Sequence, residues 1–328
     1  MSFDIGKNIH LTIFGQSHSK AIGAVIDGLP AGFRIDMRAL KAFMARRAPG
    51  QKGTTARKEA DNPVILSGLV DGFTCGSPLA MMIENTDAKS ADYKDFKRIP
   101  RPMHADYPAF VKYGGFNDIA GGGHFSGRLT APLCFAGGVC IQYLGQKGIE
   151  IKAKLASAGG VSGRKMQECI EKARKEGDSV GGIVECCITG VPAGVGDSVF
   201  DSLESSLSRV LFSIPGVKGV DFGAGFASAA MKGSAHNDAW CFDEKGNVKT
   251  KSNNHGGILG GLSTGMPITF RVAFKPTPSI ALPQESVDLK SRKSTVLEIK
   301  GRHDPCIAVR AVPCVEAAAA LVLCDCML

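Results

Sequence analysis

AIGAVIDGLPAG, residues 21–32, is the most informative segment for the fold, because the second half of the chain repeats its pattern. An apolar, strand-like run leads into GLPAG here, and another such run, GIVECCIT, leads into GVPAG at residues 190–194. Within a few residues of each copy, an aspartate precedes an amphipathic pattern with helical spacing. Each half of the chain therefore contains the same order of strand, turn and helix.

A second pair of segments supports an ancient duplication. LSGLVDGFTCGSP at residues 66–78 and LGGLSTGMP at residues 259–267 match loosely and follow the two turns in the same order. Repeats of this kind usually pack around a pseudo-twofold axis into one unit. We therefore predict a single large α/β domain over residues 1–328, built as a β-α-β sandwich with internal duplication.

The hydrophobic pattern assigns the parts of this domain. We predict pseudo-repeat halves at about 1–150 and 180–328, with a polar, peripheral connecting region at about 154–181. We predict strands near residues 9–14, 22–27, 64–70, 79–84, 182–189, 266–274 and 306–311, and helices near 36–48, 128–146, 197–212 and 314–326. The G-x-G-x-x-G and P-loop patterns are absent from the sequence, so neither a Rossmann fold nor a P-loop fold is expected.

Composition is typical of a globular protein without a membrane span. The chain has 328 residues, of which 44% are hydrophobic and 21% charged, and its apolar runs fall short of the roughly 18 residues that a membrane helix needs. The first residues, MSFDIGKNIH, lack the basic-then-apolar pattern of a secretory signal, and the eleven cysteines are scattered without a C-x-x-C pair. We therefore expect a cytoplasmic protein with reduced cysteines and no metal site.

The net charge of +8 has its basic residues concentrated in one block. Residues 34–58 contain eight basic residues and one acid. Such a block often forms a solvated face or a nucleic-acid patch, but this one has no aromatic interleaving, and Trp240 is the only tryptophan. Small polyanionic ligands remain the alternative. Arg47 continues the apolar stripe of the expected 36–48 helix, so its guanidinium would either extend to solvent or meet a buried anion.

Three of the seven histidines lie on loops shaped by glycine or proline. His18 follows a predicted strand in GQSHS, His104 lies in RPMHADYP and His303 in GRHDP. A lone histidine is more often structural than catalytic, but loops after strands commonly carry function. The glycine runs at 121–127 and 253–265 indicate either tight turns or the close approach of backbone to a ligand.

Together, these segments make the sequence similar to chorismate synthases from about Gly15 to Val322. Ten segments occur in the order that this family shows: GQSHSKAIGAVIDGLPAG, RRAPGQ, RKEAD, LSG, NTDAKSADY, RPMHADY, KYG, NNHGGILGGLSTG, KPTPSI and GRHDPCIAVRAVP. The resemblance implies a lyase of the shikimate pathway to the aromatic amino acids, which converts 5-enolpyruvylshikimate 3-phosphate to chorismate and phosphate by anti-1,4-elimination.

The resemblance also implies a cofactor and partners. The family requires reduced FMN although the overall reaction is redox-neutral, and NADPH or a separate flavin reductase would be the source of the reduction. Family membership implies a homotetramer, with no nucleic acid or membrane as a partner. The phosphates and carboxylates of substrate and flavin would account for the arginines and lysines, which bind such groups in desolvated sites.

Catalytic roles carry over to three positions. The two motif histidines of the family correspond to His18 and His104, one assisting phosphate departure and the other protonating the flavin, with the assignment between them open. Histidine suits both tasks because its pKa lies near the working pH. Asp304 corresponds to the aspartate that works through flavin N5 in removing the C6 proton.

Binding roles carry over to several short segments. The flavin contacts are expected at His124, Phe125, Ser126, Pro215, Gly216, Gly260, Lys275, Pro276, Thr277, Pro278, Ser279 and Arg302. The substrate and other anions are expected at Arg46, Arg47, Arg57 and Arg128.

The chain departs from the family at the flavin segment. The family's GGGRSSARET is represented by GGGHFSGRLT, in which His124 replaces an arginine, Phe125 a serine and Leu129 a glutamate. In addition, the family's GESHG appears as GQSHS, and Gly53 stands where relatives often have an arginine. The loss of a fixed charge and a hydroxyl predicts weaker flavin binding than in typical members. A flavin- or phosphate-binding homologue without elimination activity, and a basic protein that binds nucleic acid, are the alternatives.

Overall fold

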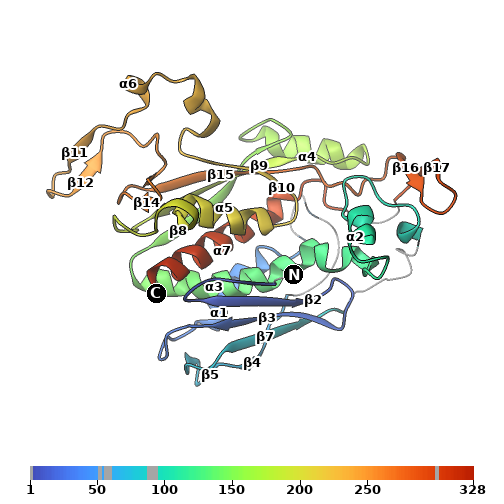
Figure 1. The fold of residues 1–328 in the computed structure, drawn as a ribbon, viewed down its shortest axis with the longest axis horizontal. Coiled ribbons are helices and arrows are strands. Elements are labelled where there is room, and N and C mark those ends of the chain that lie inside the picture. Colours follow the sequence, from blue (N-terminus) through green and yellow to red (C-terminus); the bar gives the residue numbers. More distant parts are fainter. Residues whose placement is uncertain (1–2, 51–53, 55–60, 87–94, 300–302) are drawn as a thin grey trace.

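In a computed structural model, two antiparallel sheets enclose a layer of helices (Figure 1). The structure describes residues 3–50, 54, 61–86, 95–299 and 303–328. The first sheet has the order β1 (Asp4–Ile5), β2 (His10–Gly15), β3 (Ala21–Asp27), β7 (Leu79–Glu84) and β4 (Val64–Ser67). The second has the order β10 (Val217–Phe222), β15 (Ile268–Phe274), β9 (Gly182–Thr189) and β8 (Glu150–Ala158). The predicted α/β sandwich is confirmed.

Two long helices form the middle of the sandwich. α3 (Thr130–Gln146) and α7 (Ala308–Met327) pack against each other and are buried over most of their length. α3 also contacts β3, while α7 contacts β8 and β9. A side chain at Gly137 of α3 would overlap the backbone of Ala317, so glycine and alanine let the two helix backbones approach closely. The shared helix layer therefore joins both halves into one core.

The connectivity repeats between the two halves. β2, β3, α1 (Met37–Ala45), β4, β7 and α3 follow one another in the first half, as β8, β9, α5 (Leu203–Ser213), β10, β15 and α7 do in the second. Their positions in the sheets also match, with the order β2-β3-β7-β4 in one and β8-β9-β15-β10 in the other. The duplication inferred from sequence is therefore present in the fold, while the boundaries of the halves stay a prediction.

The two GxPAG turns are held in the same way. The hydroxyl of Thr74 donates to the carbonyl of Pro30 at 2.6 Å, and that of Ser263 donates to the carbonyl of Pro192 at 2.5 Å. Each hydroxyl also accepts a bond of 2.9 Å from the backbone N–H three residues after the proline. These two hydroxyls come from LSGLVDGFTCGSP and LGGLSTGMP, so the second pair of matched segments serves to fix the first.

Shorter elements surround this core. They are the hairpin strands β5 (Leu69–Val70), β6 (Phe73–Thr74), β11 (Trp240–Phe242), β12 (Val248–Thr250), β13 (Ile258–Leu259), β14 (Leu262–Ser263), β16 (Gln284–Asp288) and β17 (Lys293–Leu297), and the helices α2 (Asp106–Lys112), α4 (Lys165–Lys175) and α6 (Gly233–His236). Within the described ranges, no helix is long and apolar enough to cross a membrane.

One predicted strand is wrong and one predicted helix begins later than expected. Residues 306–311 do not form a strand but lead into α7, which begins at Ala308. The run from Cys306 to Ala311 is short and mostly apolar, and such a run cannot be assigned to a strand or a helix by periodicity alone. The expected 197–212 helix begins at Leu203, because Ser202 caps it by accepting a bond from the N–H of Ser205 at 3.1 Å.

The connecting region contains more regular structure than its polarity indicated. Its first residues, 154–158, belong to β8, which pairs with β9 at the edge of the second sheet. α4 occupies its middle and buries only Ile170 and Ala173. The polar composition of the region thus fits an edge strand and a surface helix.

Candidate active site

A cavity of about 580 Å³ lies where the first turns of α3 and α7 meet loops from both halves. Its volume is in the range of small-molecule sites. The lining residues come from seven segments, namely 17–18, 47–49, 103–109, 117–130, 213–216, 274–278 and 304–314. The two halves of the duplicated fold therefore contribute to one site.

Most of the residues singled out in the sequence border this cavity. They are His18, Arg47, His104, His124, Phe125, Ser126, Arg128, Pro215, Gly216, Lys275, Thr277, Pro278 and Asp304. Pro276 and Ser279 are close in sequence to lining residues but do not line the cavity themselves. Arg57 and Arg302, as well as Gly53, lie outside the described residues.

Arg46 and Gly260 lie away from the cavity lining. Nη1 and Nη2 of Arg46 donate to the carboxylate of Glu316 in α7, at 2.6 and 3.0 Å. Glu316 is buried and also accepts a bond from the backbone N–H of Ala153 in β8 at 2.8 Å. Arg46 therefore compensates a buried carboxylate. Gly260 forms the turn between β13 and β14.

A glycine run positions the loop that carries His18. Gly121 has a φ of +60°, and a Cβ there would lie 2.5 Å from Ser17 Oγ and 2.7 Å from His18 Nε2. The backbone N–H of Ser17 donates to the carbonyl of Gly123 at 3.0 Å. Glycine at these positions therefore allows a left-handed turn and lets the backbone lie close to His18. This agrees with the tight-turn interpretation of the glycine run.

His104 lies in a polar but enclosed environment. Its Nε2 is 2.8 Å from Ser279 Oγ. Burial, together with the positive charges of Arg101 and Lys275, lowers the pKa of His104 to about 3, although Asp106 opposes the shift. His104 is therefore neutral near pH 7 when the cavity contains no additional charge.

The 275–279 segment fixes the loop of His104 and the position of Asp304. Lys275 Nζ donates to the carbonyl of Met103 at 2.5 Å, next to His104 in sequence. Thr277 Oγ1 donates to the backbone carbonyl of Asp304 at 2.6 Å. Burial lowers the pKa of Lys275. This segment therefore acts as a brace between two of the expected catalytic groups.

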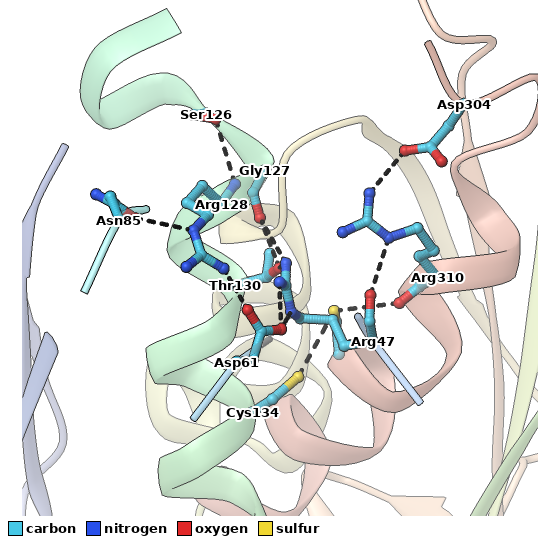
Figure 2. Close-up of polar contacts among 11 residues, drawn as sticks. Arg47, Asp61, Asn85, Ser126, Gly127, Arg128, Thr130, Cys134, Asp304 and Arg310 are labelled. Carbon is cyan, nitrogen blue, oxygen red and sulfur yellow. Dashed lines mark hydrogen bonds and ion pairs between the residues drawn. The ribbon is translucent and has the colours of Figure 1, made fainter. Parts of the chain in front are cut away.

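Asp304 is held by an arginine of α7 (Figure 2). Its Oδ2 accepts a bond of 2.8 Å from Arg310 Nη1, and the Nε of Arg310 donates to the carbonyl of Arg47 at 2.8 Å. The ion pair fixes the orientation of the Asp304 carboxylate, with Oδ2 toward Arg310. Asp304 and Arg47 are thereby connected through one guanidinium.

Asp61 joins the two arginines expected to bind anions. Figure 2 shows its carboxylate between Arg47 and Arg128, with an oxygen bonded to each. Arg47 Nε donates to Asp61 at 2.8 Å, and its Nη1 donates to Thr130 Oγ1 at 3.3 Å. Burial alone would lower the pKa of Arg47, but Asp61 outweighs it and the pKa lies above its usual value. All three charged side chains are buried, so removal of Asp61 would leave both guanidinium groups without their carboxylate partner.

Arg128 is fixed from a second side. Its Nε donates to Asn85 Oδ1 at 3.1 Å, and its backbone N–H donates to Ser126 Oγ at 3.3 Å. Ser126 therefore acts as a cap of the short turn before α3. Of the basic block, Arg47 is buried with its carboxylate partner and is therefore not part of a nucleic-acid surface, whereas Arg46 is paired with Glu316 but stays partly exposed.

The two residues that depart most from the family pattern belong to an aromatic group. The ring centroids of His124 and Phe125 are 4.2 Å apart, and His124 Nε2 is 3.3 Å from the hydroxyl of Tyr113. Burial lowers the pKa of His124. Phe125 keeps 42% of its surface exposed at the cavity. This part of the wall thus offers a ring face rather than a fixed positive charge.

Asp61 and Arg310 were not assigned a role from sequence. A helical reading of the last motif would have found Arg310, because Ile307, Arg310, Ala311 and Cys314 all line the cavity with the spacing of one helix face. The strand predicted at 306–311 concealed this spacing. Asp61 ends the family segment RKEAD, which marks the position, but nothing in the sequence indicates that it meets Arg47 and Arg128.

The lining has the chemistry to hold a planar, anionic molecule. Among the described residues, Arg47, Arg128, Lys275 and Arg310 border it as cations, together with the carboxylates Asp106, Asp118 and Asp304. Asp106 is paired with Arg101 at 2.8 Å, so part of the negative charge is neutralised outside the cavity. In the part of the chain that the structure describes, no group of three or more His, Cys, Asp or Glu side chains is arranged to hold a metal ion.

Comparisons with known proteins agree with this arrangement. A family model described as "Chorismate synthase" matches residues 9–328. The chorismate synthases of Korarchaeum cryptofilum and Thermococcus gammatolerans are 43% and 46% identical to this chain, and each alignment covers 98% of this chain and 96% of the relative. A bacterial relative with the same name, from Chitinophaga pinensis, is 46% identical with the same coverage.

A solved structure is also similar over nearly the whole chain. "Crystal Structure of Chorismate Synthase" superposes with a TM-score of 0.77 at 26% sequence identity, covering 99% of this chain and 93% of that one. The match extends across both sheets and the helices between them, so it includes every segment that borders the cavity.

Proposed function

Because the chain belongs to the chorismate synthase family, and is thus a lyase that converts 5-enolpyruvylshikimate 3-phosphate to chorismate and phosphate, we propose that it does so in this cavity with reduced FMN. The observation that carries the proposal is that His18, His104 and Asp304, from three distant parts of the chain, border one cavity together with Arg47 and Arg128.

The residues present fit a flavin. Phe125 provides an aromatic face, the backbone of Gly122 and Gly216 borders the cavity without side chains, and Lys275 can meet an anionic group. The cavity volume of about 580 Å³ is in the range of sites for molecules of this size. When bound, reduced FMN supplies electron density that eases cleavage of the carbon–oxygen bond. We propose that the lining residues of 124–126, 215–216 and 275–278 hold it.

The arginines near Asp61 would bind the anionic groups of the substrate. Arg47 and Arg128 share one carboxylate, so the three side chains together keep one positive charge. A guanidinium held in place loses little freedom when it binds a phosphate or carboxylate. Asp61 would thus orient both arginines, and Arg310 would add a further cation next to Asp304.

Proton transfer would be divided between three groups. Asp304 would accept the proton lost from the substrate, since an ionised carboxylate is an acceptor at both oxygens. His18 and His104 would supply protons, and His104 must first gain one, because its pKa lies at about 3 without ligands. A bound phosphate and two carboxylates would raise that pKa, since opposite charges nearby favour the protonated form.

The altered flavin segment would weaken cofactor binding without abolishing the reaction. His124 and Phe125 replace a fixed charge and a hydroxyl with two packed rings. The alternative of a homologue that has lost elimination activity has no finding in its favour.

We also propose a homotetramer in the cytoplasm. The segment that carries α6, β11 and β12 projects from the body of the molecule in Figure 1. Three large side chains along it, Phe226, Trp240 and Phe242, are mostly exposed. Exposed apolar groups of this kind mark surfaces that associate with another chain. The mass of the protein in solution, measured by light scattering, tests this proposal.

Anaerobic turnover tests the function together with the cofactor. The protein would be mixed with 5-enolpyruvylshikimate 3-phosphate and either chemically reduced FMN, oxidised FMN or no flavin, and chorismate and phosphate would be followed together. The proposal is supported if chorismate and phosphate form in equal amounts with reduced FMN and do not form under the other two conditions. Equal rates with oxidised FMN or without flavin would show that the cofactor assignment is wrong.

A further inference from the structure

Two cysteine pairs bridge the contact between α3 and α7. The Sγ atoms of Cys134 and Cys314 are 3.7 Å apart, and Cys140 shares a hydrogen bond with Cys324 along the same two helices. All four side chains are buried. The pairs therefore resemble each other in burial and in the elements that carry them, but they differ in their surroundings.

Cys314 borders the cavity and has cationic neighbours. The thiol of Cys134 donates a hydrogen bond to its sulfur, and Arg47 and Arg310 lie close by. These contacts, with the hydrogen bond of Cys134 first, lower the pKa of Cys314 even though burial opposes the shift. Burial raises the pKa of Cys134, its partner. Cys314, unlike Cys134, also borders the cavity, and the thiolate is the reactive form, so Cys314 would be the nucleophile of the pair.

The second pair lacks this activation. Its hydrogen bond with Cys324, followed by burial, raises the pKa of Cys140 well above the usual value, and Asp325 nearby adds negative charge. Neither Cys140 nor Cys324 borders the cavity. Cys140 and Cys324 are therefore an internal control for the chemistry of the first pair.

We propose that Cys134 and Cys314 form a peroxide-sensitive dithiol site, in which hydrogen peroxide that enters the cavity converts the two thiols to a disulfide between α3 and α7. The 3.7 Å between their sulfurs must shorten to the roughly 2.05 Å of a disulfide. The hydrogen bond of 3.6 Å that the Cys314 thiol donates to the carbonyl of Arg310 would be lost, because a disulfide sulfur carries no proton. Because Arg310 holds Asp304, the modification would reach a group of the proposed active site.

The reaction balances in two steps. The Cys314 thiolate attacks one oxygen of the peroxide, the O–O bond breaks, and the leaving hydroxide takes up a proton to become water, so that Cys314 becomes a sulfenic acid. The sulfur of Cys134 then attacks that of Cys314, the S–O bond breaks, and the hydroxyl leaves as water with the thiol proton of Cys134. Two thiols are oxidised by two electrons, and one peroxide is reduced to two waters.

The cavity would also be exposed to peroxide during use. Reduced flavins pass two electrons to dioxygen and yield hydrogen peroxide. This source of oxidant rests on the proposed function, whereas the thiol chemistry needs only peroxide. The test therefore uses added hydrogen peroxide and protein without flavin, so that a failure of the flavin assignment would not affect its outcome.

The experiment maps the disulfide in the full chain. Reduced protein is treated with increasing hydrogen peroxide, free thiols are blocked with iodoacetamide, and peptides are analysed by mass spectrometry. Trypsin leaves Cys134 and Cys140 together on residues 129–147, and Cys314 and Cys324 together on residues 311–328. Further cleavage after Phe135 and Glu316 separates the two pairs.

The expected result is a linked peptide that joins Cys134 to Cys314 and has lost two hydrogens, at peroxide levels that leave Cys140 and Cys324 alkylated. In a Cys134→Ser variant, Cys314 should instead be trapped as a sulfenic acid by dimedone. The proposal is overturned if Cys314 stays alkylated while the exposed Cys75 and Cys326 are oxidised, or if both buried pairs become linked at the same rate. Mapping of the unmodified chain decides the matter even where the variant does not fold.

Discussion

Replacement of His104 by glutamine should make the protein less sensitive to acid. In the folded chain, burial and the charges of Arg101 and Lys275 lower the pKa of His104 to about 3, whereas an unfolded histidine has a pKa near 6.5. Between these values the unfolded chain binds a proton at this position and the folded chain does not. Stability therefore falls as the pH drops below 6.5, and this loss continues to about pH 3.

The size of the effect follows from the width of that window. At pH 5 the solution lies about 1.5 units below the unfolded pKa, and each unit is worth about 1.4 kcal/mol, so His104 should cost at most about 2 kcal/mol of unfolding free energy relative to pH 7. His104→Gln keeps a side chain that can reach Ser279 but removes the titration. The variant should therefore lose about 2 kcal/mol less than the wild type between pH 7 and pH 5.

Urea unfolding at the two pH values measures this difference. All other titrating groups are common to both proteins, so their contributions cancel in the comparison. His10→Gln, which removes an exposed histidine of β2, controls for the loss of a histidine as such. Parallel losses of stability in wild type and His104→Gln would mean that His104 protonates normally in the folded chain, and the explanation by burial and neighbouring cations would be refuted.

Three further predictions concern the same cavity. Asp61→Asn should reduce the free energy of unfolding by about 3 to 5 kcal/mol in urea titrations, because it leaves two buried arginines without their carboxylate; a loss below 1 kcal/mol would show that the arginines are solvated. The double change His124→Arg and Phe125→Ser should tighten the binding of reduced FMN by about tenfold or more in anaerobic absorbance titrations, since a charged hydrogen bond is worth about 1.5 to 3 kcal/mol; unchanged affinity would place the flavin elsewhere. Substrate binding should take up a proton near pH 7 as His104 becomes charged, which calorimetry in buffers of different ionisation enthalpy detects; no uptake in the wild type would contradict the acid role of His104.

The repeated motifs predicted the fold because they reflect local rules. The GLPAG and GVPAG turns require glycine at positive φ, and each is fixed by a hydroxyl from the second matched segment. The strand pattern at 21–27 and 182–189 is likewise local, since each is a short apolar run that ends at a glycine turn. Such features can be predicted from a short segment without knowledge of the rest of the chain.

The features that sequence missed depend on distant contacts. The start of α7 is a short, mostly apolar run, which periodicity alone does not assign to a strand or a helix, and its helical form is set by packing between the sheets. The position of Arg46 could not be read either, because its partner Glu316 is 270 residues away. Asp61 acquires its role only where Arg47 and Arg128 meet it. The family resemblance indicated which residues matter, and the folded chain was needed to show which of them touch.

The most direct test of the account is the anaerobic turnover of an Asp304→Asn variant with chemically reduced FMN. Its matched control is Asp71→Asn, an exposed carboxylate in the β5–β6 turn whose φ of +51° suits asparagine. We expect both products to form in equal amounts and their rate to fall by about 10²- to 10⁴-fold for Asp304→Asn but not for Asp71→Asn, because Asp304→Asn removes a general base. Wild-type rates in a folded Asp304→Asn variant would contradict the claim that this cavity performs the reaction through Asp304.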